Sequence, residues 1–290
     1  MLKGFLFSLL TIIPFLADAQ SFYAIRRPRN LTVSGGSGIA SYKGELVNPK
    51  QLGKVRYNIA AGAEYLISSR FMVKADLTWF NIAGSDASAN DDRVERNLSF
   101  TSNNQEFSIS GAVYLLKDPK EFYRRSSFNI YAFAGAGVFH MNPKAEYQGK
   151  KYALQPLQTE AVKYSRFQFS IPYGFGVRLA VDPLHNIILE GGYRTTFTDY
   201  FDDISSRRYV DPATLSSDLS RTLADRRRER DPDYPVGPNV GVRGNPKEND
   251  GYFIFNIKYQ YYLPYYLGDN TNSSRFYRKK RKAAFNPKRR

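Results

Sequence analysis

The chain has 290 residues, a formal net charge of +15, no cysteine, and a mean hydropathy of −0.48 although 15% of its residues are aromatic. The lack of cysteine excludes disulfide bonds, thiol catalysis and thiolate metal sites. The length suits one barrel or one large sandwich, and many aromatic residues in a polar chain suit strands that are apolar on one face only.

The N-terminal segment has the three parts of a secretory signal peptide. Lys3 supplies the positive charge, residues 5–16 form an apolar run, and residues 17–19 provide a small-x-small cleavage site. The run is shorter than the roughly 20 residues that a helix needs to span a bilayer, which argues against a membrane anchor. We therefore expect a signal peptide over residues 1–19 and a periplasmic N-terminal segment over residues 20–29.

Eight later segments alternate between apolar and polar residues, as strands do when their two faces meet different surroundings. Each is long enough to cross a bilayer at a tilt, whereas strands of soluble sandwiches usually run about five to six residues. The predicted strands are Asn30–Lys43, Lys54–Ile67, Arg70–Ile82, Asn104–Lys117, Ser127–Met141, Ser165–Val181, Asn186–Tyr200 and Gly251–Leu263.

The connections between these strands alternate in length. The short ones are residues 68–69, 118–126 and 182–185, the long ones are residues 83–103, 142–164 and 201–250, and only residues 44–53 are intermediate. Outer-membrane barrels combine short periplasmic turns with long extracellular loops, and eight strands close the smallest common barrel. The sequence predicts an all-β fold, an eight-stranded antiparallel up-and-down transmembrane β-barrel over residues 30–263. We expect it in the lipid bilayer of a Gram-negative outer membrane, with both termini periplasmic.

The last strand shows the two faces most clearly. Every second residue from Phe253 to Leu263 is apolar, and the residues between them include Asn256, Lys258 and Gln260. This pattern predicts lipid on the first face and a polar interior on the second. The strand Ser127–Met141 stays open because both of its faces carry apolar residues, namely Tyr131 and Phe133 against Ile130 and Val138.

The inward positions of the predicted strands carry charges of both signs. Unpaired charges in a small filled barrel would be costly, so we expect these residues to pair as a plug rather than to form a path for protons or solutes. The predicted barrel-interior charge network consists of Arg56, Glu64, Lys74, Asp76, Glu106, Arg178, Glu190, Arg194 and Lys258.

Catalysis is not expected. The sequence offers only His140 and His185 as catalytic histidines, and no nucleophile motif accompanies either of them. A lipid-modifying barrel enzyme centred on His140 is the weakest alternative. Two distant histidines do not suggest a metal site. We therefore predict no catalytic residue, no metal site and no cofactor.

Acidic residues gather where the seventh predicted strand enters its long loop. Asp199, Asp202 and Asp203 make a calcium site conceivable, because hard cations prefer carboxylate oxygens. No regular ligand spacing follows, so solvation or pairing with Arg207 and Arg208 is the better expectation. The same loop holds a basic cluster, which we expect to be a mobile solvated segment or an interaction segment: Arg221, Arg226, Arg227, Arg228 and Arg230.

Residues 264–290 form a basic tail with interleaved aromatic residues, a composition typical of protein interfaces. The compartment excludes nucleic acid, which leaves a membrane surface, a periplasmic protein or no partner at all. The candidate partner-binding residues are Arg275, Phe276, Tyr277, Arg278, Lys279, Lys280, Arg281 and Lys282.

Five segments carry motifs of a known family: Arg96–Phe100, Asn142–Ala145, Tyr147–Glu160, Ile171–Gly176 and Gly192–Ser205. Together they resemble the PorG-like family of small outer-membrane barrels of Bacteroidota. The resemblance implies a non-enzymatic component of the type IX protein secretion and gliding motility machinery, associated with its periplasmic ring proteins. The alternative is a surface-binding module that acts through the long extracellular loops.

Overall fold

The computed structural model describes residues 29–47, 54–88, 91–117, 124–238 and 240–264. The predicted signal peptide and the candidate tail residues Arg275 to Lys282 lie outside the described residues. Eight long antiparallel strands form one closed sheet, in which β1 pairs with β10 along its whole length and β3 pairs with β4. These strands are β1 (Leu31–Lys43), β2 (Arg56–Leu66), β3 (Phe71–Ser85), β4 (Ser99–Tyr114), β5 (Phe128–His140), β8 (Phe167–Ala180), β9 (His185–Thr196) and β10 (Gly251–Tyr262).

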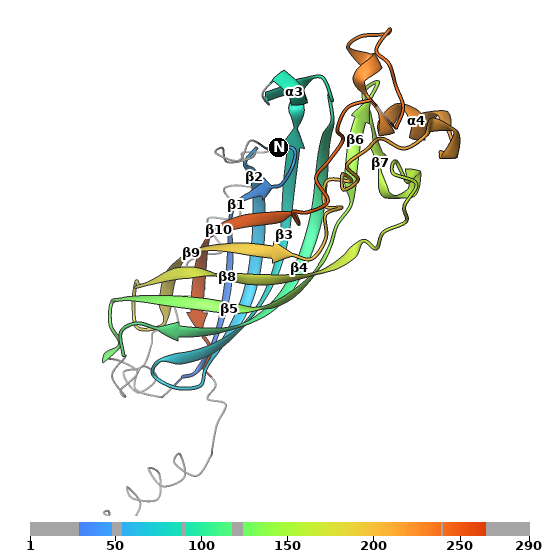
Figure 1. Ribbon diagram of the computed structural model, residues 1–290. Coiled ribbons are helices and arrows are strands. Elements are labelled where there is room, and N and C mark those ends of the chain that lie inside the picture. The colour runs from blue at the N-terminus through green and yellow to red at the C-terminus, as the bar shows by residue number, and fades with distance from the viewer. Residues whose placement is uncertain (1–28, 48–53, 89–90, 118–123, 239, 265–290) are drawn as a thin grey trace, which may run out of the picture.

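The predicted eight-stranded barrel is confirmed. Most of its strands begin and end within three residues of the predicted boundaries. Two connections that were expected to be loops contain strands instead. β3 continues to Ser85 and β4 starts at Ser99, and two short strands, β6 (Pro143–Tyr147) and β7 (Lys150–Ala153), form a hairpin beside β4. These strands rise together beyond the ends of β9 and β10 (Figure 1).

Short helices complete the connections at this end of the barrel. The elements are η2 (Asp86–Ser88), α3 (Asp91–Val94), η4 (Gln155–Leu157), η5 (Pro212–Thr214), α4 (Asp218–Ala224) and η6 (Arg227–Glu229). The hydroxyl of Ser217 caps α4 by accepting a hydrogen bond from the Ser220 N–H. Among the described residues, no helix is long and apolar enough to cross a membrane.

The barrel wall has an apolar outer face and a mixed inner face. Outward side chains such as Phe169 and Phe175 are 68% and 69% exposed, as expected for a surface that lipid covers. The strand whose faces were undecided, β5, points Tyr131 and Phe133 inward, where both are buried, and leaves Val138 outside. Two large rings therefore fill the interior instead of meeting lipid.

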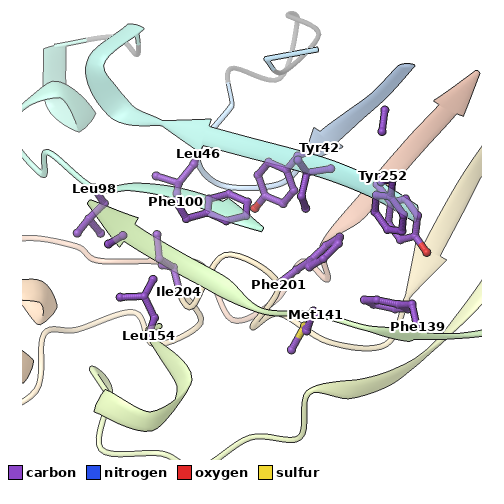
Figure 2. Close-up of a cluster of buried hydrophobic side chains, with 14 of the residues drawn as sticks. Tyr42, Leu46, Leu98, Phe100, Phe139, Met141, Leu154, Phe201, Ile204 and Tyr252 are labelled. Carbon is purple, nitrogen blue, oxygen red and sulfur yellow. The ribbon is translucent and has the colours of Figure 1, made fainter. Parts of the chain in front are cut away.

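The long connections fold over the barrel mouth as a loop cap, which comprises the described parts of residues 44–55, 86–98, 141–166 and 197–250. Its core joins side chains of barrel strands to side chains of loops (Figure 2). Phe201 is fully buried there, with its ring centroid 5.2 Å from that of Phe139 and 5.4 Å from that of Tyr252. Burial of this ring fixes the start of the longest loop against the end of the barrel.

Candidate functional site: a charged interior and a folded loop cap

Four charged side chains form a closed set in the middle of the barrel. Lys258 Nζ lies 2.8 Å from Asp76 Oδ1 and 3.1 Å from Glu190 Oε1. Lys74 makes an ion pair with Glu190 and lies 3.7 Å from the second carboxylate oxygen of Asp76. All four side chains are buried, and the two lysines balance the charge of the two carboxylates.

Neighbouring groups complete the hydrogen bonding of this set. The Tyr131 hydroxyl donates to Glu190, and the Lys74 ammonium lies 4.6 Å from the centroid of the Phe133 ring. Glu64, also buried, accepts a hydrogen bond of 2.6 Å from Gln260 Nε2. The inward rings of β5 therefore stabilise the charges as well as fill space.

The remaining members of the predicted network lie outside this central set. Arg194 Nε is 3.5 Å from Glu106 Oε2, and Ser170 donates a hydrogen bond of 3.3 Å to the other oxygen of Glu106. The Arg178 guanidinium, fully buried, lies 4.9 Å from the centroid of the Tyr114 ring. The structure contradicts the placement of Arg56: it is exposed at the first residue of β2, because the pairing of β2 with β3 begins only at Asn58.

The other eight predicted network residues comprise four carboxylates and four cations, all buried. The interior is thus balanced in charge and packed with large side chains, among them Tyr114, Tyr131 and Arg178. An eight-stranded barrel filled in this way is a packed core rather than a channel.

At the barrel mouth, one tyrosine hydroxyl joins two carboxylates. The Tyr42 oxygen is 2.7 Å from Asp202 Oδ2 and 2.6 Å from Asp250 Oδ1. The outer oxygens of these carboxylates accept backbone N–H groups of Ile204 and Phe201. A hydroxyl has a single proton to donate, so the arrangement is favourable when one carboxyl keeps its own proton.

Burial has the largest effect on the acidic groups of this cluster. It raises the pKa of Asp250 to about 7, and burial together with the charge of Asp250 raises the pKa of Asp202 well above its usual range. Burial and the same neighbour raise the pKa of Asp199 to about 8. Burial also raises the pKa of Asp203 to about 6, although the Arg243 guanidinium opposes the change.

The expected pairing of these aspartates with Arg207 and Arg208 is wrong. Asp203 instead accepts hydrogen bonds from Thr159 and from the Tyr164 hydroxyl, the latter at 2.6 Å. Arg207 and Arg208 are exposed. Partners for the acidic residues come from a different loop, which the sequence order does not reveal.

The basic cluster of the long loop is also structured, contrary to expectation. Arg226 pairs with Glu229 at 2.8 Å and Arg227 pairs with Asp225 at 2.6 Å. The Arg227 guanidinium lies close to two tyrosine rings, 3.9 Å from the centroid of Tyr209 and 4.9 Å from that of Tyr234. The arginines therefore hold the loop together instead of carrying it as a solvated chain.

A cleft of about 690 Å³ opens among the loops of the cap. Its walls include the rings of Tyr193, Tyr209 and Tyr234 together with polar side chains such as Asn245 and Glu248. Burial raises the pKa of Tyr209 to about 12, and its hydroxyl has no hydrogen-bond partner among the described residues. The lining also includes basic side chains such as Lys43 and Arg243. Tyrosine faces beside charged and amide groups are suited to a polar ligand.

The two histidines lie far apart on the described barrel. The His140 ring packs against Phe167 with centroids 5.0 Å apart and forms no hydrogen bond with another described residue. His185 lies 2.6 Å from Asp182 in a short turn and stacks on Tyr261. Within the described parts of the chain, no group of three or more His, Cys, Asp or Glu side chains is arranged to hold a metal ion.

Comparisons with known proteins agree with the architecture. A family model described as the outer membrane protein beta-barrel domain matches residues 6–216. A comparison with curated protein sequences finds no match.

Similar solved structures include three small barrels. Ail, the attachment invasion locus protein of Yersinia pestis, in complex with the heparin analogue sucrose octasulfate, is 11% identical; the match covers 81% of this chain and 100% of Ail, with a TM-score of 0.37. The N-terminal β-barrel domain of Pseudomonas aeruginosa OprF is 6% identical, with 82% and 100% covered and a TM-score of 0.38. The outer membrane enzyme PagL is 12% identical, with 80% and 99% covered and a TM-score of 0.33. Similarities this distant carry no information about function.

Proposed function

Because the chain belongs to the outer membrane protein beta-barrel domain family, it is a small barrel of the Gram-negative outer membrane, and we propose that it anchors a periplasmic assembly there. In this proposal the long loops are extracellular and both termini are periplasmic. The protein is not an enzyme and does not conduct solutes. It acts as a rigid membrane fixture for a partner below the membrane.

The observation that carries the proposal is the packed, charge-balanced interior. A barrel whose centre is occupied by Lys74, Asp76, Glu190 and Lys258 has no lumen for transport, so its surfaces and terminal segments are what remain for function. The basic, aromatic composition of residues 264–290 suits docking to a protein. The resemblance to the PorG-like family supports the periplasmic ring proteins of the type IX secretion system as the proposed partner.

Deletion of residues 275–290 should leave the barrel folded and remove the partner. Affinity purification from mildly solubilised outer membrane, followed by mass spectrometry, measures recovery of the ring proteins. We expect full recovery with the intact chain and loss with the deletion, while heat-dependent gel mobility shows an unchanged barrel. A chain with residues 275–290 in scrambled order keeps the charge of the tail and tests whether the partner recognises the order of its residues. Recovery of the ring proteins with the deleted chain would exclude docking through the tail.

A second function is favoured by the cleft in the loop cap: binding of a polar, saccharide-like ligand at the cell surface. Tyrosine rings offer stacking faces, and the amides and carboxylates around them offer hydrogen bonds. In this case the loops, rather than the tail, carry the function.

Two variants in the cleft test this second function. Tyr234→Ala removes one ring and Lys43→Gln removes a cation of the cleft wall. We expect each variant to bind the glycans identified on a glycan array with an affinity lower by about tenfold or more, the usual loss at a binding hot spot. Lys163→Gln, at another exposed lysine of the cap, serves as the control and should change nothing. Tail deletion should leave this binding intact, so the two functions give opposite results.

A further inference from the structure

A second, smaller hollow lies on the outside of the barrel wall. This groove has a volume of about 290 Å³ and crosses β3 and β4, with the start of β2 on one side and the β6–β7 hairpin on the other. The residues that matter for the argument are Arg56, Tyr57, Asn81, Asn103, Lys144 and Lys151.

The groove lies where the apolar belt ends. Along β3 the outward residues change from Leu77 and Trp79, which are 38% and 43% exposed, to Asn81. Along β4 they change from Phe107, which is 51% exposed, to Asn103. Asn81 and Asn103 are direct partners in the β3–β4 register, so a single row of amides marks the boundary between hydrocarbon and headgroups.

Three cations flank this row without partners among the described residues. Arg56 and Lys151 are exposed, and Lys144 is half-buried opposite Thr101 of β4. The nearest carboxylate in the hairpin register is Glu146, opposite Lys151, yet the two form no ion pair. Cations held beside a membrane surface attract anionic headgroups, and here no described protein carboxylate competes for them.

The spacing of the cations matches a headgroup with charges at two ends. Arg56 on β2 and Lys144 on β6 are separated by three steps between neighbouring strands, which is about 14 Å. The floor between them offers the amide groups of Asn81 and Asn103, which have no hydrogen-bond partner among the described residues. Amides in the centre suit sugar hydroxyls, and cations on both flanks suit phosphates.

We propose that this groove binds the phosphorylated sugar headgroup of an outer-leaflet glycolipid of the lipopolysaccharide type. The acyl chains of the glycolipid would lie against the apolar belt below, and Tyr57, 65% exposed, sits at the level where interfacial aromatic residues anchor barrels. The inference takes the extracellular orientation of the loops from the proposed function. It does not involve the periplasmic partner.

The test is a titration of the full-length protein in detergent micelles with a purified diphosphorylated lipid A glycolipid, with bound lipid counted by native mass spectrometry. The variant R56Q/K144Q/K151Q removes the three cations. Because each Lys or Arg near an anionic surface contributes about 1 kcal/mol, we expect the affinity to fall by about a hundredfold at low salt. The charge-preserving variant R56K/K144R/K151R should bind nearly as well as the natural chain.

Matched controls separate the groove from general charge. The variant K163Q/R208Q/K247Q removes three exposed cations of the cap outside the groove and should bind normally. Dephosphorylated glycolipid and phosphatidylglycerol should bind poorly, and inorganic phosphate should not displace the glycolipid. A loss below about tenfold in the groove variant would overturn the proposal, since three cations near an anionic surface should contribute more. So would an equal loss in the control variant, equal binding of phosphatidylglycerol, or full displacement by inorganic phosphate.

Discussion

Replacing Glu190 by glutamine should lower the free energy of unfolding by about 3–5 kcal/mol, the usual cost of breaking a buried ion pair by removing one partner. The substitution keeps the size of the side chain but leaves Lys74 and Lys258 with Asp76 as their remaining partner in the central set. Neither lysine can reach water, because each is 1% exposed. The result would be an uncompensated positive charge inside the barrel.

The measurement is urea-driven unfolding of the barrel in lipid vesicles. Trp79 is the single tryptophan of the chain and lies on the outer face of β3, so its fluorescence reports insertion directly. Glu146→Gln, at an exposed glutamate of β6, should shift stability by less than about 0.5 kcal/mol, as surface substitutions usually do.

A double variant sharpens this result. Adding Lys74→Met to Glu190→Gln removes the excess cation and should recover much of the lost stability, because an apolar group of similar size can replace a buried ion pair at little cost. A barrel that tolerates Glu190→Gln with a loss of less than about 1 kcal/mol would show that water or protonation changes compensate the interior charges.

The second expected result concerns pH. The loop cap should be more stable at pH 5 than at pH 8, because burial raises the pKa of Asp250 to about 7 and that of Asp199 to about 8. The ordinary pKa of an unfolded aspartate is about 3.9, so folding favours the protonated form. The stabilisation is complete below that value and is lost as the pH rises through about 7 to 8, when the carboxylates ionise beside Asp202 and Glu45.

Hydrogen–deuterium exchange of residues 197–250, corrected for the intrinsic effect of pH on exchange, measures the opening of the cap. We expect opening to be at least about tenfold more frequent at pH 8, since one unit of pKa corresponds to about 1.4 kcal/mol. Asp202→Asn keeps the hydrogen-bonding shape beside Tyr42 but removes one charge, and should flatten this dependence.

Asp233→Asn, at an exposed aspartate of the same loop, is the matched control and should leave the pH dependence unchanged. Equal or greater protection at pH 8 in the natural chain would contradict the assignment of the Asp202–Tyr42–Asp250 cluster as a protonated contact. That outcome would leave the apolar contacts of Phe201 as the main restraint on the loop.

The sequence by itself determined the class of fold and most strand positions. A two-residue period over a dozen positions, as from Phe253 to Leu263, indicates a sheet with two different surroundings. The alternation of short and long connections is typical of a barrel with longer loops at one end. The charges at inward positions followed from the same period, except for Arg56, which lies at the first residue of β2, ahead of the pairing of β2 with β3.

Only the tertiary structure decided which partners these residues meet. The sequence pattern of β5 did not show which of its two apolar faces lies inside the barrel. In the structure, β5 pairs with β4 and β8 so that Tyr131 and Phe133 point inward, beside Lys74. The β6–β7 hairpin exists as part of the sheet because the edge of β4 extends beyond β5 and accepts it. The cap contacts join segments up to about two hundred residues apart, such as Tyr42 and Asp250, and no local pattern records such a pairing. Periodicity reports the surroundings of a strand, whereas the partner of a side chain depends on how the whole chain closes.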